Sequence, residues 1–265
     1  MVKIGFKDLD EIIEIQNNDL IVIESRPAMG KTNFVINIMV NMNKDIPVLM
    51  FSLEESRELI TNKILNIKKI SNDFTNIQNI FVDDVPKPTV DEIILKAKEY
   101  KEEKDIKLVV IDYIQLIKEY GSEKEKVVQK LKLLANEINV PIIVTSQLSR
   151  VVEERENCIP TLTDINKTLI EKSDKVLLIY RDECYNPDTY KPHIAEIIIA
   201  KNDGRTGIVQ LLYMKKYNRF ANIARIDALS ENKVSDEKYM TINLSEKSKP
   251  QVATFWYINN DIVRF

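Results

Sequence analysis

The chain has 265 residues, of which 44% are hydrophobic and 30% charged, a composition typical of a folded protein rather than a disordered segment. Its 38 Lys and Arg residues against 41 Asp and Glu residues leave a net charge of −3, which argues against attachment to nucleic acid through bulk positive charge. Two cysteines and one histidine exclude a disulfide framework and a zinc site, and no apolar run reaches the roughly 20 residues of a membrane span.

Short apolar runs alternate with helical stretches as far as residue 180. This alternation predicts right-handed crossovers and a mainly parallel sheet. Strands are predicted at residues 20–24, 47–53, 80–82, 108–113, 141–145 and 175–180, and helices at residues 31–42, 55–68, 90–104 and 124–139.

The pattern changes after residue 180, where two apolar runs flank a turn at 201–207 and predict an antiparallel hairpin of residues 194–200 and 208–214. We therefore expect one α/β domain over residues 1–220, with a mainly parallel twisted sheet and the hairpin near its C-terminal end. Residues 221–265 are less regular, with one β-like stretch at 253–258, and we expect them to pack on the same domain. Without a cleavable signal, the protein is expected in the cytoplasm, with no membrane partner.

A phosphate-binding loop is predicted after the first strand, in Ser25-Arg26-Pro27-Ala28-Met29-Gly30-Lys31-Thr32. The segment fits G-x-x-x-x-G-K-[ST] except for serine at its first position, and it follows a strand and opens a helix, as this motif requires. We expect all of these residues to bind ATP, with backbone N–H groups around the β- and γ-phosphates. Lys31 would supply charge to the γ-phosphate, and the Thr32 hydroxyl would bind Mg²⁺. The alternative is an ordinary strand-to-helix turn.

Polar side chains follow three further predicted strands. Asp112 ends the run LVVID, where its carboxylate would bind Mg²⁺. Glu54 would be the general base for an attacking water, and Gln147, after PIIVTS, would sense the γ-phosphate or orient the water. Because parallel sheets bind ligands at the carboxyl ends of their strands, we expect the three side chains near the phosphate loop. Each of them alone could instead be a solvated group of a loop.

Six short motifs follow one another along the chain: RPAMGKT (26–32), FSLE (51–54), VIDYIQL (110–116), SQLSR (146–150), YRDE (180–183) and a hairpin closing in RF (219–220). They occur in the same order as in the ATPase domain of replicative DNA helicases of the DnaB type, which the sequence resembles from residue 4 to residue 220, and the opening GFKDLDE (5–11) is similar too. The resemblance implies a RecA-like fold, a homo-oligomer in the form of a hexameric ring with ATP at its subunit interfaces, and single-stranded DNA in its centre. It also implies the roles in ATP binding and hydrolysis given above, and a primase or a helicase loader as further partners.

Two features depart from the family pattern. An N-terminal domain and a linker helix precede the motor in this family, whereas the present sequence opens at the motor. The hairpin tip, similar to K-x-R-N-G-x-x-G in the family, is one residue shorter here: Lys201 matches the lysine that reaches a neighbour's γ-phosphate, but Asp203 stands where the arginine finger is expected. Arg205 is the candidate replacement in a catalytic role, and its alternative is an ordinary charge on a solvated turn.

The DNA-binding and base-binding residues rest on the resemblance. Arg150, Arg155, Asn166 and Lys167 are candidates for contacts with DNA phosphates, although glutamates surround the two arginines and a solvated charged loop is the alternative. Arg181 and Phe220 are candidates for flanking the base or ribose of the nucleotide. A strand-end arginine and a packed phenylalanine are the alternatives for these two.

The preferred function is an ATP-driven DNA helicase motor that hydrolyses ATP at subunit interfaces and translocates on single-stranded DNA. A second hypothesis is an ATP-binding accessory or assembly module of the same fold that does not unwind DNA. The altered finger favours it, and so does the DNA loop after Asp164, which reads INKTLIEKSDK (165–175) where the family usually has an arginine, an acid and a glycine-containing turn. A RecA-like recombinase or a clock-type ATPase is the third hypothesis, and the details of the motifs fit it less well.

Overall fold

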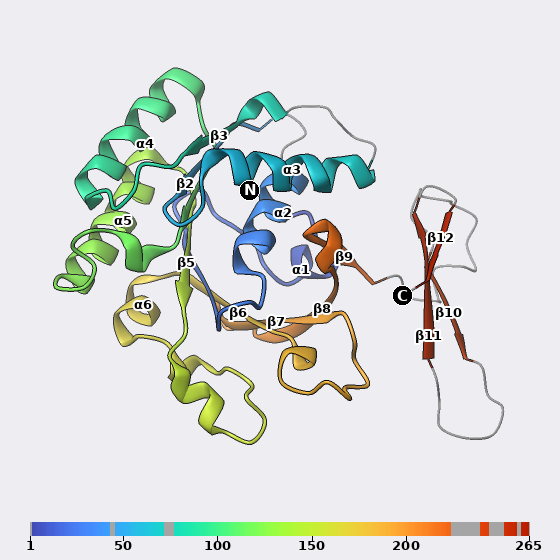
Figure 1. Ribbon diagram of the computed structural model, residues 1–265. Helices are drawn as coiled ribbons and strands as arrows, with labels where there is room; N and C mark the ends of the chain where they lie inside the picture. Colours follow the sequence, from blue (N-terminus) through green and yellow to red (C-terminus); the bar gives the residue numbers. More distant parts are fainter. Residues whose placement is uncertain are drawn as a thin grey trace. The chain divides into compact units, whose positions relative to one another are not determined.

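The computed structural model describes residues 2–42, 46–71, 77–223, 239–243, 252–258 and 261–264. The chain divides into two compact units, one ending at Ala221 and the other beginning at Asn222 (Figure 1). The first unit contains a nine-stranded sheet and the second a three-stranded sheet. That the C-terminal extension packs on the first domain stays a prediction.

The larger sheet runs in the order β3-β2-β4-β5-β1-β6-β7-β8-β9. The pairs among its first six strands are parallel, whereas β7 pairs antiparallel with β6 and β8 antiparallel with β7. The predicted α/β fold with a hairpin near the C-terminal end of the domain is confirmed. The strands are β1 (Leu20–Ser25), β2 (Val48–Ser52), β3 (Ile80–Asp83), β4 (Leu108–Asp112), β5 (Ile142–Gln147), β6 (Lys175–Tyr180), β7 (Ile194–Asn202), β8 (Gly207–Met214) and β9 (Arg219–Asn222).

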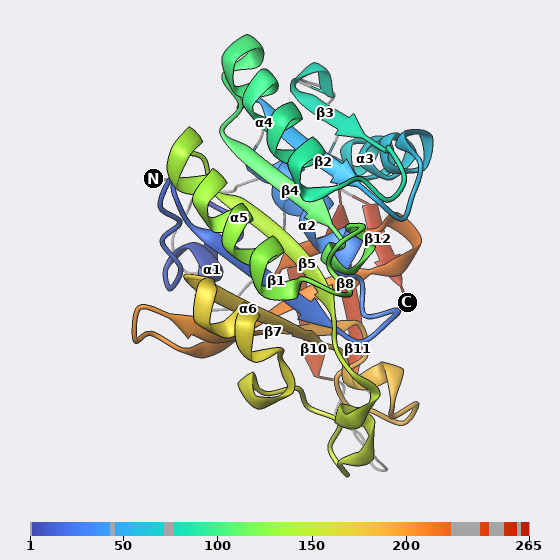
Figure 2. The same ribbon diagram turned by 90° about the vertical axis from the view of Figure 1, so that its left-hand side faces the viewer.

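Helices cover both faces of this sheet, α1, α2 and α3 on one side and α4, α5 and α6 on the other, the side that faces the viewer in Figure 2. The helices are α1 (Lys7–Asp10), α2 (Lys31–Met42), α3 (Arg57–Ser71), α4 (Val90–Lys104), α5 (Lys124–Ile138) and α6 (Lys167–Lys172). Single 3-10 turns lie at Ile77–Asn79, Ile114–Leu116, Arg150–Glu154, Leu162–Asp164, Asp182–Cys184 and Lys215–Tyr217.

The central strands are buried on both faces, which explains why their sequences are uninterrupted apolar runs. Along β1, Ile21 and Ile23 belong to the core beneath α2, whereas Leu20 and Val22 belong to the core beneath α5. The other central strands divide their residues in the same way. Successive side chains of a strand point to opposite faces, so each central strand contributes to both helical layers.

Helix ends follow local signals in some places and distant partners in others. α4 begins at a capping box, in which Thr89 and Glu92 bond each other's backbone N–H groups, and it has the predicted bounds. α3 begins at Arg57, two residues later than predicted, where the Arg57 N–H donates to Asp84 Oδ2 at 2.8 Å. That partner follows β3 and cannot be read from the local pattern. No helix within the described ranges is long and apolar enough to cross a membrane.

The second unit contains a three-stranded antiparallel sheet with β11 in its centre. Its strands are β10 (Tyr239–Asn243), β11 (Val252–Ile258) and β12 (Asp261–Arg264). The β-like stretch predicted at 253–258 lies within β11, so that prediction is confirmed.

A buried carboxylate lies near the carboxyl end of β1. Glu24 is 2% exposed, and burial raises its pKa to about 7, although a hydrogen bond with Ser146 and the charge of Lys31 act in the opposite direction. The unfolded chain releases this proton at about pH 4.3. The folded state therefore holds more protons than the unfolded state between about pH 4 and 7, and stability falls as the pH rises through this window.

We expect Glu24→Gln to be more stable than the wild type above pH 7, by up to about 3 kcal/mol, and equally stable at pH 4. Glutamine keeps an acceptor for the Ser146 hydroxyl but carries no charge to desolvate. Thermal unfolding between about pH 4 and pH 9 measures this difference. Glu102→Gln, at an exposed position of α4, is the control and should follow the wild type. Parallel pH profiles for Glu24→Gln and the wild type would contradict the prediction.

Candidate nucleotide-binding site

The phosphate loop between β1 and α2 turns through two residues in left-handed conformations. Ala28 has a φ of 64° and Gly30 a φ of 98°. At Gly30 a Cβ would also lie 3.2 Å from Cζ of Phe220, so the position requires glycine for its φ and for close approach. The Phe34 N–H donates to the Gly30 carbonyl at 2.8 Å, so α2 starts in the loop. The first N–H groups of a helix lack intrahelical partners and are suited to bind phosphate.

Asp112 connects this loop to the sheet. Its side chain is buried; Oδ2 accepts a hydrogen bond from the Thr32 hydroxyl at 2.7 Å, and Oδ1 accepts one from the Thr145 hydroxyl. Burial raises the pKa of Asp112, against the opposite effect of the two hydroxyls and of Lys31. The Thr32 hydroxyl and the Asp112 carboxylate are hard oxygen donors and fit Mg²⁺, which takes one or two protein ligands and completes its shell with water and phosphate oxygens.

Lys31 and Glu54 interact electrostatically with Asp112 and with each other. β2 and β4 end side by side, with Ser52 opposite Asp112 and the Leu53 N–H donating to the Asp112 carbonyl at 2.8 Å, which brings Glu54 to this edge. Burial lowers the pKa of Lys31, while the charges of Asp112 and Glu54 oppose that shift. Desolvation raises the pKa of Glu54, and the charge of Asp112 raises it further. Glu54 is exposed, so water can reach its carboxylate.

Gln147 ends β5 next to the phosphate loop, opposite Ser25 in the strand register. The Gln115 side chain holds its backbone: the Gln147 N–H donates to Gln115 Oε1 at 3.4 Å, and Gln115 Nε2 donates to the Gln147 carbonyl at 3.3 Å. Gln147 also lines a cavity of about 460 Å³ together with Glu24 and Asn166. The structure thus brings the expected phosphate sensor and one residue of the expected DNA loop to the same cavity.

The buried side chains of Arg181 and Phe220 lie against the phosphate loop. Arg181 is buried, donates to the Ala28 carbonyl at 3.2 Å and lies 4.3 Å from the centre of the Tyr213 ring. Phe220 is buried between Phe34 and Tyr213, with ring centres 5.2 and 4.5 Å away. Both side chains therefore stabilise the loop conformation, and contact with a base or ribose stays a prediction.

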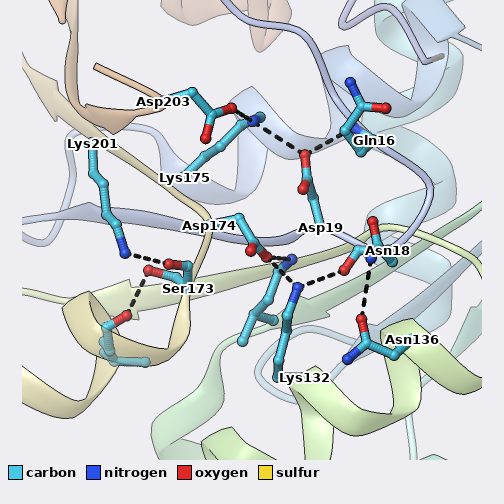
Figure 3. Close-up of polar contacts among 12 residues, drawn as sticks. Gln16, Asn18, Asp19, Lys132, Asn136, Ser173, Asp174, Lys175, Lys201 and Asp203 are labelled. Carbon is cyan, nitrogen blue, oxygen red and sulfur yellow. Dashed lines mark hydrogen bonds and ion pairs between the residues drawn. The ribbon is translucent and has the colours of Figure 1, made fainter. Parts of the chain in front are cut away.

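The charged residues of the hairpin tip bond within the chain (Figure 3). Lys201 Nζ donates to the carbonyls of Ile170 and Ser173 at the end of α6, at 2.7 and 2.5 Å. Asp203 accepts from Lys175 Nζ at 3.0 Å, and Lys175 also forms an ion pair with Asp19 at 3.3 Å.

Lys175 is 1% exposed, and although burial lowers its pKa, hydrogen bonds to Asp203 and Asp19 raise it above the usual value. The Asp203 carboxylate at the expected finger position is thus paired with a buried cation of its own chain, which it shares with Asp19. Arg205 is exposed, and among the described residues its guanidinium donates no hydrogen bond.

Three of the four expected DNA-binding residues lie between β5 and α6, and Lys167 is the first residue of α6. Arg150 and Lys167 are exposed. Lys167 Nζ lies 3.5 Å from Glu171 Oε1, one turn further along α6. Arg155 forms an ion pair with Asp164. Asn166 is the N-cap of α6, where its side chain accepts from the Thr168 N–H at 2.9 Å.

The sequence motifs did not identify several polar residues that belong to the site. Glu24, Gln115 and Thr145 bond or line the site as described above, and each had a weak signal as a polar residue at the end of an apolar strand run or just after it. Arg26, expected to bind nucleotide, is buried and bonds Leu148 and Glu153. Nothing in the local sequence predicts that direction, because both partners lie more than a hundred residues away.

Comparisons with known proteins agree with this geometry. The family described as "DnaB-like helicase C terminal domain" matches residues 1–78 and 61–222. The chain is 36% identical over 255 residues to the replicative DNA helicase DnaB of Geobacillus stearothermophilus, covering 83% of this chain and 56% of that protein. It is 35% identical over 255 residues to the replicative DNA helicase DnaC of Bacillus subtilis, with the same coverage. The chain thus spans little more than half the length of these relatives.

Solved structures show the same fold. One of them, described as an ATPase domain, matches with a TM-score of 0.77 at 29% identity, over 84% of this chain and 91% of that one. A DnaB-like replicative helicase, described with its interactions with primase, matches with the same TM-score and identity, over 84% of this chain and 62% of that one. The sheet is therefore RecA-like, and the chain belongs to the family of DnaB-like helicase C-terminal domains, as its motifs predict.

Proposed function

We propose that this chain is the ATP-hydrolysing motor of a DnaB-type replicative DNA helicase, which translocates on single-stranded DNA. The observation that carries the proposal is the bond between the Thr32 hydroxyl and the Asp112 carboxylate at 2.7 Å. It unites the phosphate loop with the carboxyl end of β4, at the edge where Lys31 and Glu54 also lie. Membership of the helicase family supports the same conclusion.

In this mechanism the γ-phosphate of ATP lies against Lys31 and the N–H groups of the loop, which stabilise the charge that develops during hydrolysis. Glu54 takes the proton of the attacking water, and its raised pKa makes it a stronger base than an ordinary carboxylate. Thr32 and Asp112 would hold Mg²⁺, which neutralises phosphate charge when bound. Gln147 would report the presence of the γ-phosphate to the DNA loop across the shared cavity.

The hairpin would complete the site of a neighbouring subunit in a homo-oligomer, which we expect to be a hexameric ring. Because Lys175 pairs with Asp203 as well as with Asp19, it would offset part of the repulsion between the aspartate and a neighbour's phosphate. Arg205 is exposed and its side chain donates no hydrogen bond within the described part of the chain, so it is the best candidate for the group acting across the interface. Lys201 could take part only after leaving two carbonyl groups.

DNA and protein partners follow from the same proposal. Arg150, Asn166 and Lys167 are exposed beside the cavity and would contact phosphates of single-stranded DNA. One structural relative was solved with its interactions with primase, which supports a primase as partner, and a helicase loader is a further candidate. We place this activity in the cytoplasm.

A second candidate function is an ATP-binding accessory module that does not unwind DNA. The hairpin favours it, because both family positions at the tip, Lys201 and Asp203, are bonded within the chain. In that case Arg205 would contribute nothing to hydrolysis.

Glu54→Gln should lower ATP hydrolysis by about 10²–10⁴-fold, because the general base is lost, while nucleotide affinity changes little. Phosphate release with and without a single-stranded oligonucleotide measures this, and Glu99→Gln, at an exposed position of α4, is the control. Strong DNA stimulation in the wild type and in the control supports the motor. Nucleotide binding without DNA-dependent turnover, in an oligomeric preparation, would favour the accessory module.

Arg205→Ala should lower hydrolysis by about 10³-fold or more if Arg205 acts as a finger. Because the finger and the base would come from different subunits at one interface, a mixture of Arg205→Ala and Glu54→Gln subunits should hydrolyse ATP faster than either variant alone. Lys98→Ala, which removes an ion pair with Glu137 of α5, is the control and should behave like the wild type. A mixture no more active than its components, or a monomer as active as the oligomer, would contradict the role across the interface.

A further inference from the structure

The side chain of Arg26, the second residue of the phosphate loop, is directed at the segment that follows β5. Nη1 donates to the carbonyl of Leu148 at 2.7 Å, and Nε donates to Glu153 Oε1 at 2.9 Å. The side chain is 9% exposed. A planar guanidinium can hold two acceptors in one fixed geometry, which the single ammonium of a lysine cannot do.

The backbone of the loop makes a third connection to the same segment. The Leu148 N–H donates to the Ser25 carbonyl at 3.0 Å. The residue after Gln147 is therefore held through its N–H by Ser25 and through its carbonyl by Arg26. The buried side chains of Leu148 and Val152 anchor the same segment to the core.

Gln115 holds the segment from the opposite side, through both backbone groups of Gln147. Gln115 Nε2 also donates to the Ser146 hydroxyl at 2.9 Å. Residues 146–148 are thus fixed between the phosphate loop and the turn after β4. A displacement of the loop at Ser25 and Arg26 must be transmitted to them or break these bonds.

The charge of Arg26 is balanced within the chain. Hydrogen bonding to Arg26 lowers the pKa of Glu153, and the Tyr185 hydroxyl donates to the same oxygen of Glu153 at 3.4 Å. An arginine that served as a phosphate ligand would have to leave a carboxylate and a carbonyl group, and the buried carbonyl would lose a charge-assisted bond. The geometry therefore separates Arg26 from the phosphate-binding residues among which the sequence motif places it.

We propose that Arg26 is a positioning residue that couples the phosphate loop to residues 147–154, with Glu153 as its partner. The proposal rests on the proposed function and deepens it, because this segment begins with the expected phosphate sensor and leads to the expected DNA loop. When nucleotide binding moves the loop, Arg26 carries the movement to Leu148 and Glu153. The nucleotide itself is bound by other groups.

The test compares Arg26→Gln, Glu153→Gln and the double variant with the wild type, in the full chain. The dissociation constant of a fluorescent ATP analogue should change by less than about threefold in all three. The kcat for ATP with single-stranded DNA should fall by about tenfold to a hundredfold in Arg26→Gln, as for a catalytic group held in the wrong place. Because the two residues share one bond, the double variant should be no slower than Arg26→Gln.

A second measurement does not depend on hydrolysis. Hydrogen exchange of the peptide covering residues 147–154 should slow in the wild type when a non-hydrolysable ATP analogue binds, and this response should be lost in Arg26→Gln at saturating analogue. Lys96→Gln, which removes an ion pair with Asp83 on another part of the sheet edge, is the matched control and should keep the response.

Three results would overturn the proposal. The first is analogue binding that weakens tenfold or more in Arg26→Gln but not in Glu153→Gln, since Arg26 would then be a phosphate ligand. The second is a fall in melting temperature with an unchanged kcat per bound nucleotide, which indicates a structural role only. The third is an exchange response as large as that of the wild type. A wild type that binds the analogue without hydrolysing ATP refutes the proposed function alone, and the exchange experiment still decides the role of Arg26.

Discussion

The buried carboxylate of Asp112 is the point at which three separate elements become one site. It bonds hydroxyl groups from α2 and β5 while itself ending β4, so it fixes the phosphate loop relative to the ends of β2 and β5, where Glu54 and Gln147 lie. Its partners are neutral hydroxyls, which compensate its desolvation only in part. Burial accordingly disfavours the charged forms of Asp112, Glu54 and Lys31 at once. A metal ion together with a polyphosphate would supply the charges that this group of residues lacks, and this explains how a stable fold can hold a site poised for a highly charged ligand.

Much of this arrangement could be predicted because it depends on short-range patterns. Apolar runs identified the strands, and helical periodicity gave α2 and α4 their observed bounds. The carboxyl ends of parallel strands necessarily meet at one edge, so the sequence alone predicts that Glu54, Asp112 and Gln147 lie near the loop.

What could not be predicted are contacts between residues far apart in the chain. The sequence motif assigns Arg26 to the nucleotide, but its direction depends on Leu148 and Glu153, which become neighbours only because β1 and β5 are adjacent in the sheet. The start of α3 depends on Asp84 for the same kind of reason. Asp203 is a further example: an aspartate at the finger position suggests repulsion of phosphate, and the buried Lys175 that offsets part of this charge belongs to a different strand.

The pairing of Lys175 with Asp203 also constrains how this hairpin can change over evolutionary time. An arginine at position 203 would restore the family's tip but would set a second cation against a buried one, leaving Asp19 to balance both. A neutral residue at position 175 would leave the two aspartates without their shared cation. Positions 175 and 203 are therefore coupled through charge. A hairpin transferred from a relative without the first residue of β6 would leave Lys175 with Asp19 as its remaining ion-pair partner, whereas a transfer that includes this residue would keep the pairing of the donor.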